Sequence, residues 1–276
     1  MKRLPLALEP VPLELAWNDP EENLRRMDEA VVRRLDRARG DSEERLFIFP
    51  ELTLTGFVTQ NPKTFSWTPP DSAIFRVLEL ARRRKTAIAF GFPENNPEAP
   101  ERPFNALLLA RPDGSIAGHY RKMHLFTVGR EPESSFFSAG DRGVLCEHRG
   151  WLLALSICFD LRFPRLYHEY ACAGADVILA PACWVGGPHK SVQFRTLAAA
   201  YAVLSQAYVA AVNRSGRDPH FDYDGSAHVF SPFGEPALQD GSCGLDESVL
   251  IECRKMRVRD ADRKSYPWSL YRSGRP

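Results

Sequence analysis

The sequence predicts an α/β fold in which helices cover sheets. Short continuous apolar runs, such as Leu46–Phe49 and Val177–Ala180, have the length and composition of strands that are buried on both faces. Longer segments between them carry apolar residues at helical spacing. The turn signature Arg111–Gly114 joins two further apolar runs and so adds a hairpin to the alternation. Helices that alternate with buried strands are typical of sheets packed against helices.

The first half of the chain is expected to begin with a helix. Asp19 can cap it, and Pro20 suits the first helical position because its missing N–H would be unpaired there in any case. Apolar residues then recur at helical spacing as far as Gly40. The elements expected next are the strand Leu46–Phe49, a helix over Asp71–Arg84, the strand Ala87–Phe90, and the hairpin strands Phe104–Ala110 and Ser115–Tyr120.

The second half continues the alternation. Its expected elements are the strand Trp151–Ile157, the helix Tyr167–Ala173, the strand Val177–Ala180, the helix Gln193–Gln206, and the strands Tyr208–Val212, Ala227–Ser231 and Ser248–Glu252. No repeat and no linker interrupts them, so residues 1–253 are predicted to form a single domain. Residues 254–276 form a polar tail with embedded aromatic residues, among them Trp268. This tail is expected to dock on the domain or on a partner subunit.

Composition excludes several functional classes. A chain of 276 residues can bury a sizeable core, and a net charge of +1 gives no reason to expect nucleic acid or an anionic membrane as a partner. No apolar run approaches the roughly 18 residues of a membrane span. The N-terminal residues lack a signal-peptide core, so a cytoplasmic protein is expected. The six cysteines are then expected to be thiols, and their spacing indicates no metal site.

Three polar residues each follow a predicted strand and break an apolar context: Glu51, Lys122 and Cys158. Sites in α/β folds lie beyond the C-terminal ends of strands. If these side chains meet, the carboxylate can take the thiol proton, and the ammonium can favour the thiolate and then an oxyanion. Taken singly, each residue also has a structural explanation, as a cap, a solvated charge or a small core residue. Spacing alone leaves that choice open.

Local motifs around these residues resemble the signatures of the nitrilase superfamily of carbon–nitrogen hydrolases. The resemblance extends from about Leu6 to Glu252, with its motifs in the family's order. The matching segments are Phe49–Leu52 with Thr55–Phe57, Tyr120–Phe126, Ile157–Pro164, Glu133 with Phe137 and Ala139–Gly140, and Gln206–Val209 leading to Asn213–Gly216.

The resemblance implies an αββα sandwich that usually forms a homodimer through helices near the nucleophile. It implies that Glu51 is the general base, Lys122 the oxyanion stabiliser and Cys158 the nucleophile, with no cofactor. Glu133 would hold Lys122 and orient the substrate, and the backbone N–H of Phe159 would help to bind the oxyanion.

Two neighbours of the nucleophile have structural explanations as well. Asp160 and Arg162 are expected to pair and build the turn at the nucleophile, although Arg162 could also bind substrate. His124 is expected to be a packed, hydrogen-bonded residue rather than a base.

The segment after Cys158 resembles the omega-amidase and deaminated-glutathione-amidase branches, so the expected substrate is a small amide with a carboxylate at its far end. Candidate cations for that carboxylate are Lys190, Arg130 and Arg162, and Trp184 and Phe126 could supply apolar walls. Two alternatives remain open: an N-carbamoyl hydrolase with the same triad, and a non-catalytic binding protein. The chain departs from those branches at Gln193, Phe194, Tyr201, Leu204, Ser205 and Ala227.

Overall fold

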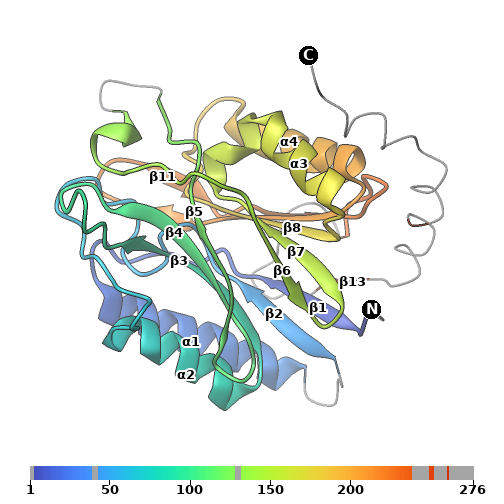
Figure 1. The fold of residues 1–276 in the computed structure, drawn as a ribbon, viewed down its shortest axis with the longest axis horizontal. Coiled ribbons are helices and arrows are strands. Elements are labelled where there is room, and N and C mark those ends of the chain that lie inside the picture. Colours follow the sequence, from blue (N-terminus) through green and yellow to red (C-terminus); the bar gives the residue numbers. More distant parts are fainter. Residues whose placement is uncertain (1–2, 39–42, 128–131, 238–248, 252–259, 261–276) are drawn as a thin grey trace.

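A computed structural model describes residues 3–38, 43–127, 132–237, 249–251 and 260. Two sheets pack face to face between two pairs of helices, which is the expected αββα arrangement (Figure 1). Helices α1 (Pro20–Arg37) and α2 (Ser72–Arg84) cover the outer face of one sheet. Helices α3 (Pro164–Ala173) and α4 (Lys190–Ser205) cover the outer face of the other.

The first sheet has six strands in the order β13-β1-β2-β3-β4-β5. Strands β1, β2 and β3 run parallel, while β3, β4 and β5 form antiparallel hairpins. The short strand β13 returns from the far end of the chain and pairs antiparallel with β1. The bounds are β1 Leu6–Pro10, β2 Glu44–Ile48, β3 Ala87–Glu94, β4 Phe104–Ala110, β5 Ile116–Arg121 and β13 Val249–Ile251.

The second sheet has five strands in the order β12-β9-β8-β7-β6. Its centre, β7, β8 and β9, is parallel, and antiparallel strands flank it on both sides. A separate two-stranded ribbon, β10 with β11, follows β9. The bounds are β6 Val144–His148, β7 Trp151–Leu155, β8 Val177–Ala182, β9 Tyr208–Asn213, β10 Ser215–Arg217, β11 Asp222–Asp224 and β12 Ala227–Phe230.

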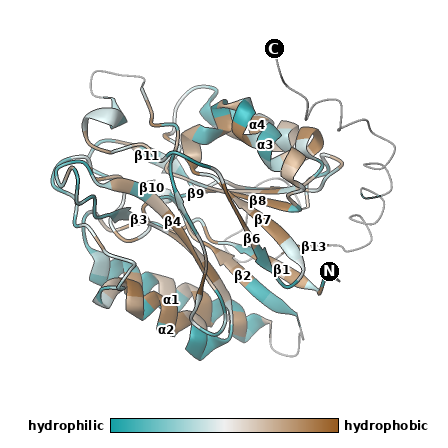
Figure 2. Ribbon diagram, in the orientation of Figure 1, coloured by the Kyte–Doolittle hydropathy of each residue, from teal (hydrophilic) through white to brown (hydrophobic). Residues whose placement is uncertain are grey.

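The first two helices begin where their capping residues predict, whereas α3 and α4 each begin three residues before the predicted start. Asp19 accepts a hydrogen bond from the N–H of Glu22 at 3.2 Å at the start of α1. Asp71 accepts from the N–H groups of Ala73 and Ile74, both at 3.1 Å, at the start of α2. Both helices turn an apolar face toward the sheet and a polar face outward (Figure 2).

The main core lies between the two sheets. Leu8, Ile48 and Leu107 from the first sheet belong to the same buried cluster as Leu153 and Leu179 from the second. A second cluster fills the space between the first sheet and helices α1 and α2. Because both faces of the first sheet are covered, its central strands are continuously apolar, which is why they were recognisable in the sequence.

Strands β1, β6, β10 and β11 were not expected. Strand β1 carries Glu9 in its interior and proline at its end, features that argue against a buried strand. Glu9 is nevertheless only 1% exposed, because it forms ion pairs with Arg34, at 3.1 Å, and with Arg45. A paired charge can occupy a core position that an isolated charge cannot.

Four of the cysteines lie in the described part of the chain, Cys146, Cys158, Cys172 and Cys183, and all are free thiols as expected. No helix among the described residues is long and apolar enough to cross a membrane. The expected docking tail, residues 254–276, lies outside the described residues apart from Asp260.

Candidate active site

The structure brings Glu51, Lys122 and Glu133 together in one buried network. The Lys122 ammonium lies 2.7 Å from Oε1 of Glu51, and 3.0 and 2.8 Å from Oε1 and Oε2 of Glu133. All three side chains are at most 1% exposed. Oε2 of Glu133 also accepts the backbone N–H of Phe126 at 2.7 Å. One cation therefore neutralises two acids away from water, an arrangement that would be strongly unfavourable without these contacts.

Glu51 follows β2 in a tight turn that packs against β3. Its neighbour Leu52 has a φ of +49°, in the left-handed region. Gly91 of β3 lies directly beneath, and a Cβ atom there would come within 2.4 Å of the Leu52 nitrogen. The glycine therefore lets the turn approach the sheet closely, and this approach sets the depth of the Glu51 carboxylate.

Cys158 follows β7 at the start of the 3₁₀ helix η2 (Cys158–Arg162) and has a φ of +47°. Left-handed backbone at a non-glycine residue is strained, and such strain persists where surrounding contacts enforce it. Here Asp160 enforces it: its carboxylate accepts from the Ile157 N–H at 2.8 Å and the Tyr120 hydroxyl at 2.7 Å. The same carboxylate binds the His124 ring at 2.7 Å, so His124 is packed and hydrogen-bonded, as expected.

Electrostatics at the site differ from the expectation in one respect. Burial alone would lower the pKa of Lys122, but the charges of Glu133 and Glu51 outweigh it and raise that pKa well above its usual value. Burial and the charge of Glu51 also raise the pKa of Cys158 well above its usual value, and Lys122 offsets only part of this. Lys122 therefore favours the thiolate, as expected, but in the resting site its effect is smaller than those of burial and Glu51.

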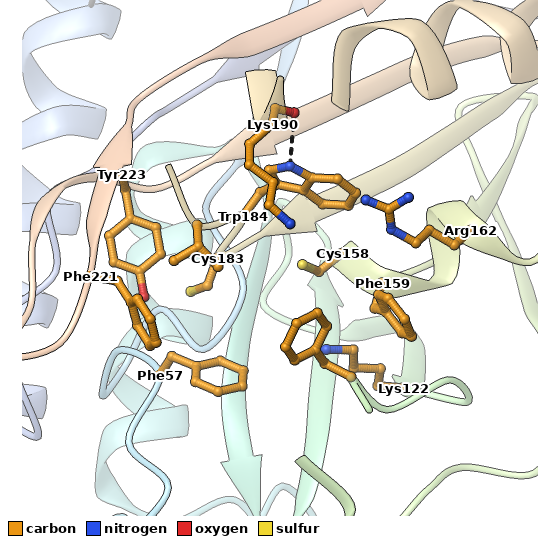
Figure 3. A pocket seen from close by; sticks show the side chains of 12 residues that line it. Phe57, Lys122, Cys158, Phe159, Arg162, Cys183, Trp184, Lys190, Phe221 and Tyr223 are labelled. Atoms are coloured by element: carbon orange, nitrogen blue, oxygen red, sulfur yellow. Dashed lines mark hydrogen bonds between the residues drawn. The ribbon is translucent and has the colours of Figure 1, made fainter. Parts of the chain in front are cut away.

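A pocket of about 580 Å³, its open mouth included, leads to Cys158 and Lys122. The side chains of Cys158, Cys183 and Trp184 point into it from one side, and Phe57 and Phe221 from another (Figure 3). Half of the residues that line it are aromatic: Phe57, Phe126, Phe159, Trp184, Phe221 and Tyr223. Phe126, Phe159 and Trp184, which were expected to contact the substrate, therefore all line this pocket.

Two cations, Lys190 and Arg162, also line the pocket. Lys190 begins α4 and forms no ion pair within the described part of the chain; its backbone oxygen accepts the Trp184 indole N–H at 3.0 Å. Arg130, the third cation considered, lies outside the described residues.

The expected pair between Asp160 and Arg162 is not formed. Arg162 instead donates to Oε1 of Gln193 at 2.7 Å and stacks on Trp184 with its guanidinium carbon 4.9 Å from the ring centre. The Asp160 carboxylate instead accepts hydrogen bonds from the Ile157 N–H and the Tyr120 hydroxyl and contacts the His124 ring, so it does not pair with Arg162. Gln193, one of the departures noted in the sequence, thus helps to hold Arg162 at the pocket wall.

Other departures pack inside the molecule. Phe194 is fully buried, with its ring centre 5.2 Å from that of Trp184, and Tyr201 stacks on Tyr167 at 3.9 Å. Leu204, by contrast, is 62% exposed on α4.

Sequence reasoning missed two residues that contact the carboxylates. Asn105, near the start of β4, donates from Nδ2 to Oε1 of Glu51 at 2.7 Å and to Oε1 of Glu133 at 3.1 Å. The backbone N–H of Cys183 donates to Oε2 of Glu51 at 2.7 Å, and its thiol contacts the Glu51 carbonyl oxygen at 3.2 Å. Both carried a signal: Asn105 is a lone amide in an apolar strand, and Cys183 directly follows a buried one.

No group of three or more side chains in the described ranges could hold a metal ion. The chemistry that the site offers is that of its own side chains. A thiol faces the pocket beside an ammonium, and two carboxylates lie behind them. These groups can supply a nucleophile, a proton acceptor and an oxyanion partner.

Comparisons with known proteins agree with this geometry. The chain matches the carbon-nitrogen hydrolase family over residues 8–252. The omega-amidase YafV of Yersinia enterocolitica is 31% identical over 245 residues, which are 86% of this chain and 87% of that protein.

Solved structures share the fold. A CN-hydrolase superfamily protein from Xanthomonas campestris, with an arsenic adduct in its active site, is 25% identical with a TM-score of 0.80, and the match covers 98% of this chain and 97% of that one. A mutant amidase from Nesterenkonia sp. AN1, with the acetamide moiety of fluoroacetamide added covalently at its active-site cysteine, is 25% identical with a TM-score of 0.76 and coverages of 99% and 97%. The chain therefore belongs to the carbon–nitrogen hydrolase family of the nitrilase superfamily and is a hydrolase of non-peptide amide bonds.

Proposed function

We infer that this chain is an amidase that releases ammonia from a small amide through a thioester on Cys158. The observation that carries this inference is the buried contact of Lys122 with both Glu51 and Glu133 beside a thiol that faces an open pocket. In this arrangement one group can attack, a second can move a proton, and a third can neutralise an oxyanion.

The attack step requires Glu51 to act as the base. Because burial and Glu51 raise the pKa of Cys158, the resting thiol keeps its proton. The proton passes to Glu51 as sulfur bonds to the amide carbon, and the carbonyl π electrons move onto oxygen. Lys122 and the N–H of Phe159, in the first turn of η2, donate to that oxyanion. A well-placed donor of this kind typically contributes about 3–4 kcal/mol to lowering the barrier.

Collapse of the tetrahedral intermediate breaks the carbon–nitrogen bond. Glu51 returns its proton to the leaving nitrogen, so that ammonia departs and the thioester remains on Cys158. Water then loses a proton to Glu51 and attacks the thioester carbon through a second oxyanion. Collapse of this oxyanion breaks the carbon–sulfur bond, and Glu51 returns its proton to the sulfur. The products are a carboxylic acid, which ionises in water, and the free thiol. Glu133 keeps Lys122 oriented throughout through its two contacts.

The substrate that best fits the pocket is a small amide with a carboxylate at its far end, such as an α-keto acid ω-amide. Aromatic walls favour a short apolar body, while Lys190 supplies a charge that no carboxylate neutralises within the described residues. Arg162 is held by Gln193 and Trp184 at the same wall, where it adds positive potential. Similarity to an omega-amidase supports the same substrate class.

Lys190→Met tests this assignment because it removes the charge and keeps an aliphatic side chain. A charge-assisted contact is worth roughly 1.5–3 kcal/mol, so kcat/KM for a carboxylate-bearing amide should fall roughly 10- to 150-fold, mainly through KM. Hydrolysis of a neutral amide of the same length should change little. Lys85→Met, at the C-terminal end of α2, is the matched control and should leave both substrates unaffected.

An ammonia-release screen over amides, carbamoyl compounds and nitriles completes the test. If neutral amides or carbamoyl compounds were hydrolysed far better than every carboxylate-bearing amide, the omega-amidase assignment would be wrong. A loss in Lys190→Met that was equal for charged and neutral amides would likewise contradict a carboxylate contact.

A further inference from the structure

The amide of Asn105 lies between the two carboxylates of the site. Its Nδ2 donates to Oε1 of Glu51 at 2.7 Å and to Oε1 of Glu133 at 3.1 Å. Lys122 Nζ contacts the same two oxygens, at 2.7 and 3.0 Å. Two nitrogen donors therefore bridge the same pair of acceptor atoms, and Asn105 is fully buried.

The ammonium of Lys122 has no spare donor in the resting site, which is why the bridge made by Asn105 matters. An ammonium has three N–H groups. Lys122 has three carboxylate contacts, two to Glu133 and one to Glu51, so its donors are all engaged in the resting site. An oxyanion in the pocket can be stabilised by Lys122 only if one of these contacts is released.

The contact that can be released most easily is the longest, from Lys122 to Oε1 of Glu133 at 3.0 Å. Oε1 of Glu133 keeps the Asn105 donor after that release, while Oε2 keeps Lys122 and the Phe126 N–H. Every carboxylate oxygen therefore keeps a hydrogen-bond partner when Lys122 releases this contact. A buried oxygen left without a partner would make the release unfavourable.

The orientation of the amide supports this role. Oδ1 of Asn105 is buried and has no hydrogen-bond partner in the described part of the structure. An unpartnered buried oxygen is unfavourable, but the opposite orientation would direct that oxygen at two carboxylates. The backbone of Asn105 is also held next to Lys122, because its carbonyl oxygen accepts a hydrogen bond from the backbone N–H of Lys122 at 2.8 Å. The amide is thus fixed relative to the lysine that it assists.

We propose that Asn105 is a positioning residue of the reaction: by donating to both Glu51 and Glu133, it frees one N–H of Lys122 for the oxyanion of the tetrahedral intermediate. This inference rests on the proposed amidase function. It concerns the rate of the chemical step and not substrate affinity, because Asn105 does not line the pocket.

Asn105→Leu tests the proposal, since leucine is similar in size and cannot donate. We expect kcat to fall roughly 100-fold, the scale of losing one oxyanion donor, with KM little changed. The melting temperature should fall by only a few degrees at most, because the substitution also removes the unpartnered oxygen. Asn105→Ala, which is smaller and also cannot donate, should show the same loss of kcat and serves if the leucine variant does not fold.

Thr86→Val is the matched control. Thr86 is only 1% exposed and directly precedes β3, where its hydroxyl donates to the carbonyl oxygen of Arg45 at 2.7 Å. This contact lies at the start of β2, whereas Glu51 follows the end of that strand. Loss of the contact should lower the melting temperature and leave kcat of the folded enzyme unchanged.

The outcomes separate this inference from the proposed function. If folded Asn105→Leu or Asn105→Ala kept a kcat near that of the unmodified enzyme while Cys158→Ala was inactive, the role of Asn105 would be refuted and the amidase mechanism would stand. An effect confined to KM would also overturn the role of Asn105. Substantial turnover by Cys158→Ala would instead refute the proposed function itself.

Discussion

At the scale of single residues, the decisive feature is the charge balance around Cys158. Glu51 and Glu133 share the one ammonium of Lys122, and the thiol lies in the same buried region. A thiolate would add a further negative charge there, which explains why the pKa of Cys158 is raised. In this account the nucleophile is activated during the attack, by proton transfer to Glu51, and is not stored as a thiolate.

This charge balance predicts how Cys158 reacts with a small neutral thiol reagent such as methyl methanethiosulfonate. Below the pKa of a thiol the thiolate fraction rises about tenfold per pH unit. A raised pKa keeps Cys158 in that regime, so its modification rate should climb steadily from pH 6 to pH 8.5. Peptide mapping at several times would measure the rate at this cysteine alone. A plateau below pH 7 would show a stabilised thiolate and would contradict the account.

Which residues of the site could be predicted depends on what surrounds them in the sequence. Glu51, Lys122 and Cys158 were predictable because each is polar directly after a strand and lies in a family motif. For Asn105 the lone amide in an apolar strand marks the position but not the role, because its partners are 54 and 28 residues away in the sequence. The pair expected between Asp160 and Arg162 was wrong for a similar reason: Tyr120 and His124, close to Asp160 only in space, occupy that carboxylate.

At the scale of elements, the site is assembled from strand ends of both sheets. Glu51 follows β2 and Lys122 follows β5 in the first sheet, while Cys158 follows β7 and Cys183 follows β8 in the second. Continuous apolar runs predict β2, β7 and β8, because both faces of their sheets are covered, whereas β5 is predicted by the hairpin turn that precedes it. The ribbon β10–β11, which brings Tyr223 and Phe221 to the pocket, has no such pattern. Its strands are only three residues long and Tyr223 is the one buried residue in them, so no apolar run could predict them.

At the scale of the whole molecule, the outer surface of α4 carries apolar side chains that no described residue covers. Val192 is 66% exposed, Leu204 62% and Val203 49%. Helices α3 and α4 lie on the outside of the second sheet (Figure 1), and α4 packs against η2, which begins at Cys158. We propose that this surface forms the interface of a homodimer, since exposed apolar patches commonly mark protein–protein contacts.

Light scattering tests the dimer. At micromolar concentration we expect a mass near twice the 31.2 kDa of one chain. Leu204→Glu should shift the mass toward that of a monomer, because a charge at the centre of an apolar interface opposes association. Phe75→Glu, at a residue 53% exposed on α2, on the opposite side of the molecule, is the matched control and should leave the mass unchanged. A monomeric unmodified protein would contradict the proposal.

The central claim, that Cys158 carries the acyl group of an amide substrate, is tested most directly by intact-protein mass spectrometry after rapid acid quenching. The account predicts a mass increase equal to the acyl group during turnover of a good amide substrate, located on the peptide that contains Cys158 and absent from Cys158→Ala, which should be inactive. Glu51→Gln should form the adduct very slowly, since the thiol then lacks its base. If ammonia were released at an undiminished rate by Cys158→Ala, or if the acyl group were found on another residue, the covalent mechanism would be contradicted.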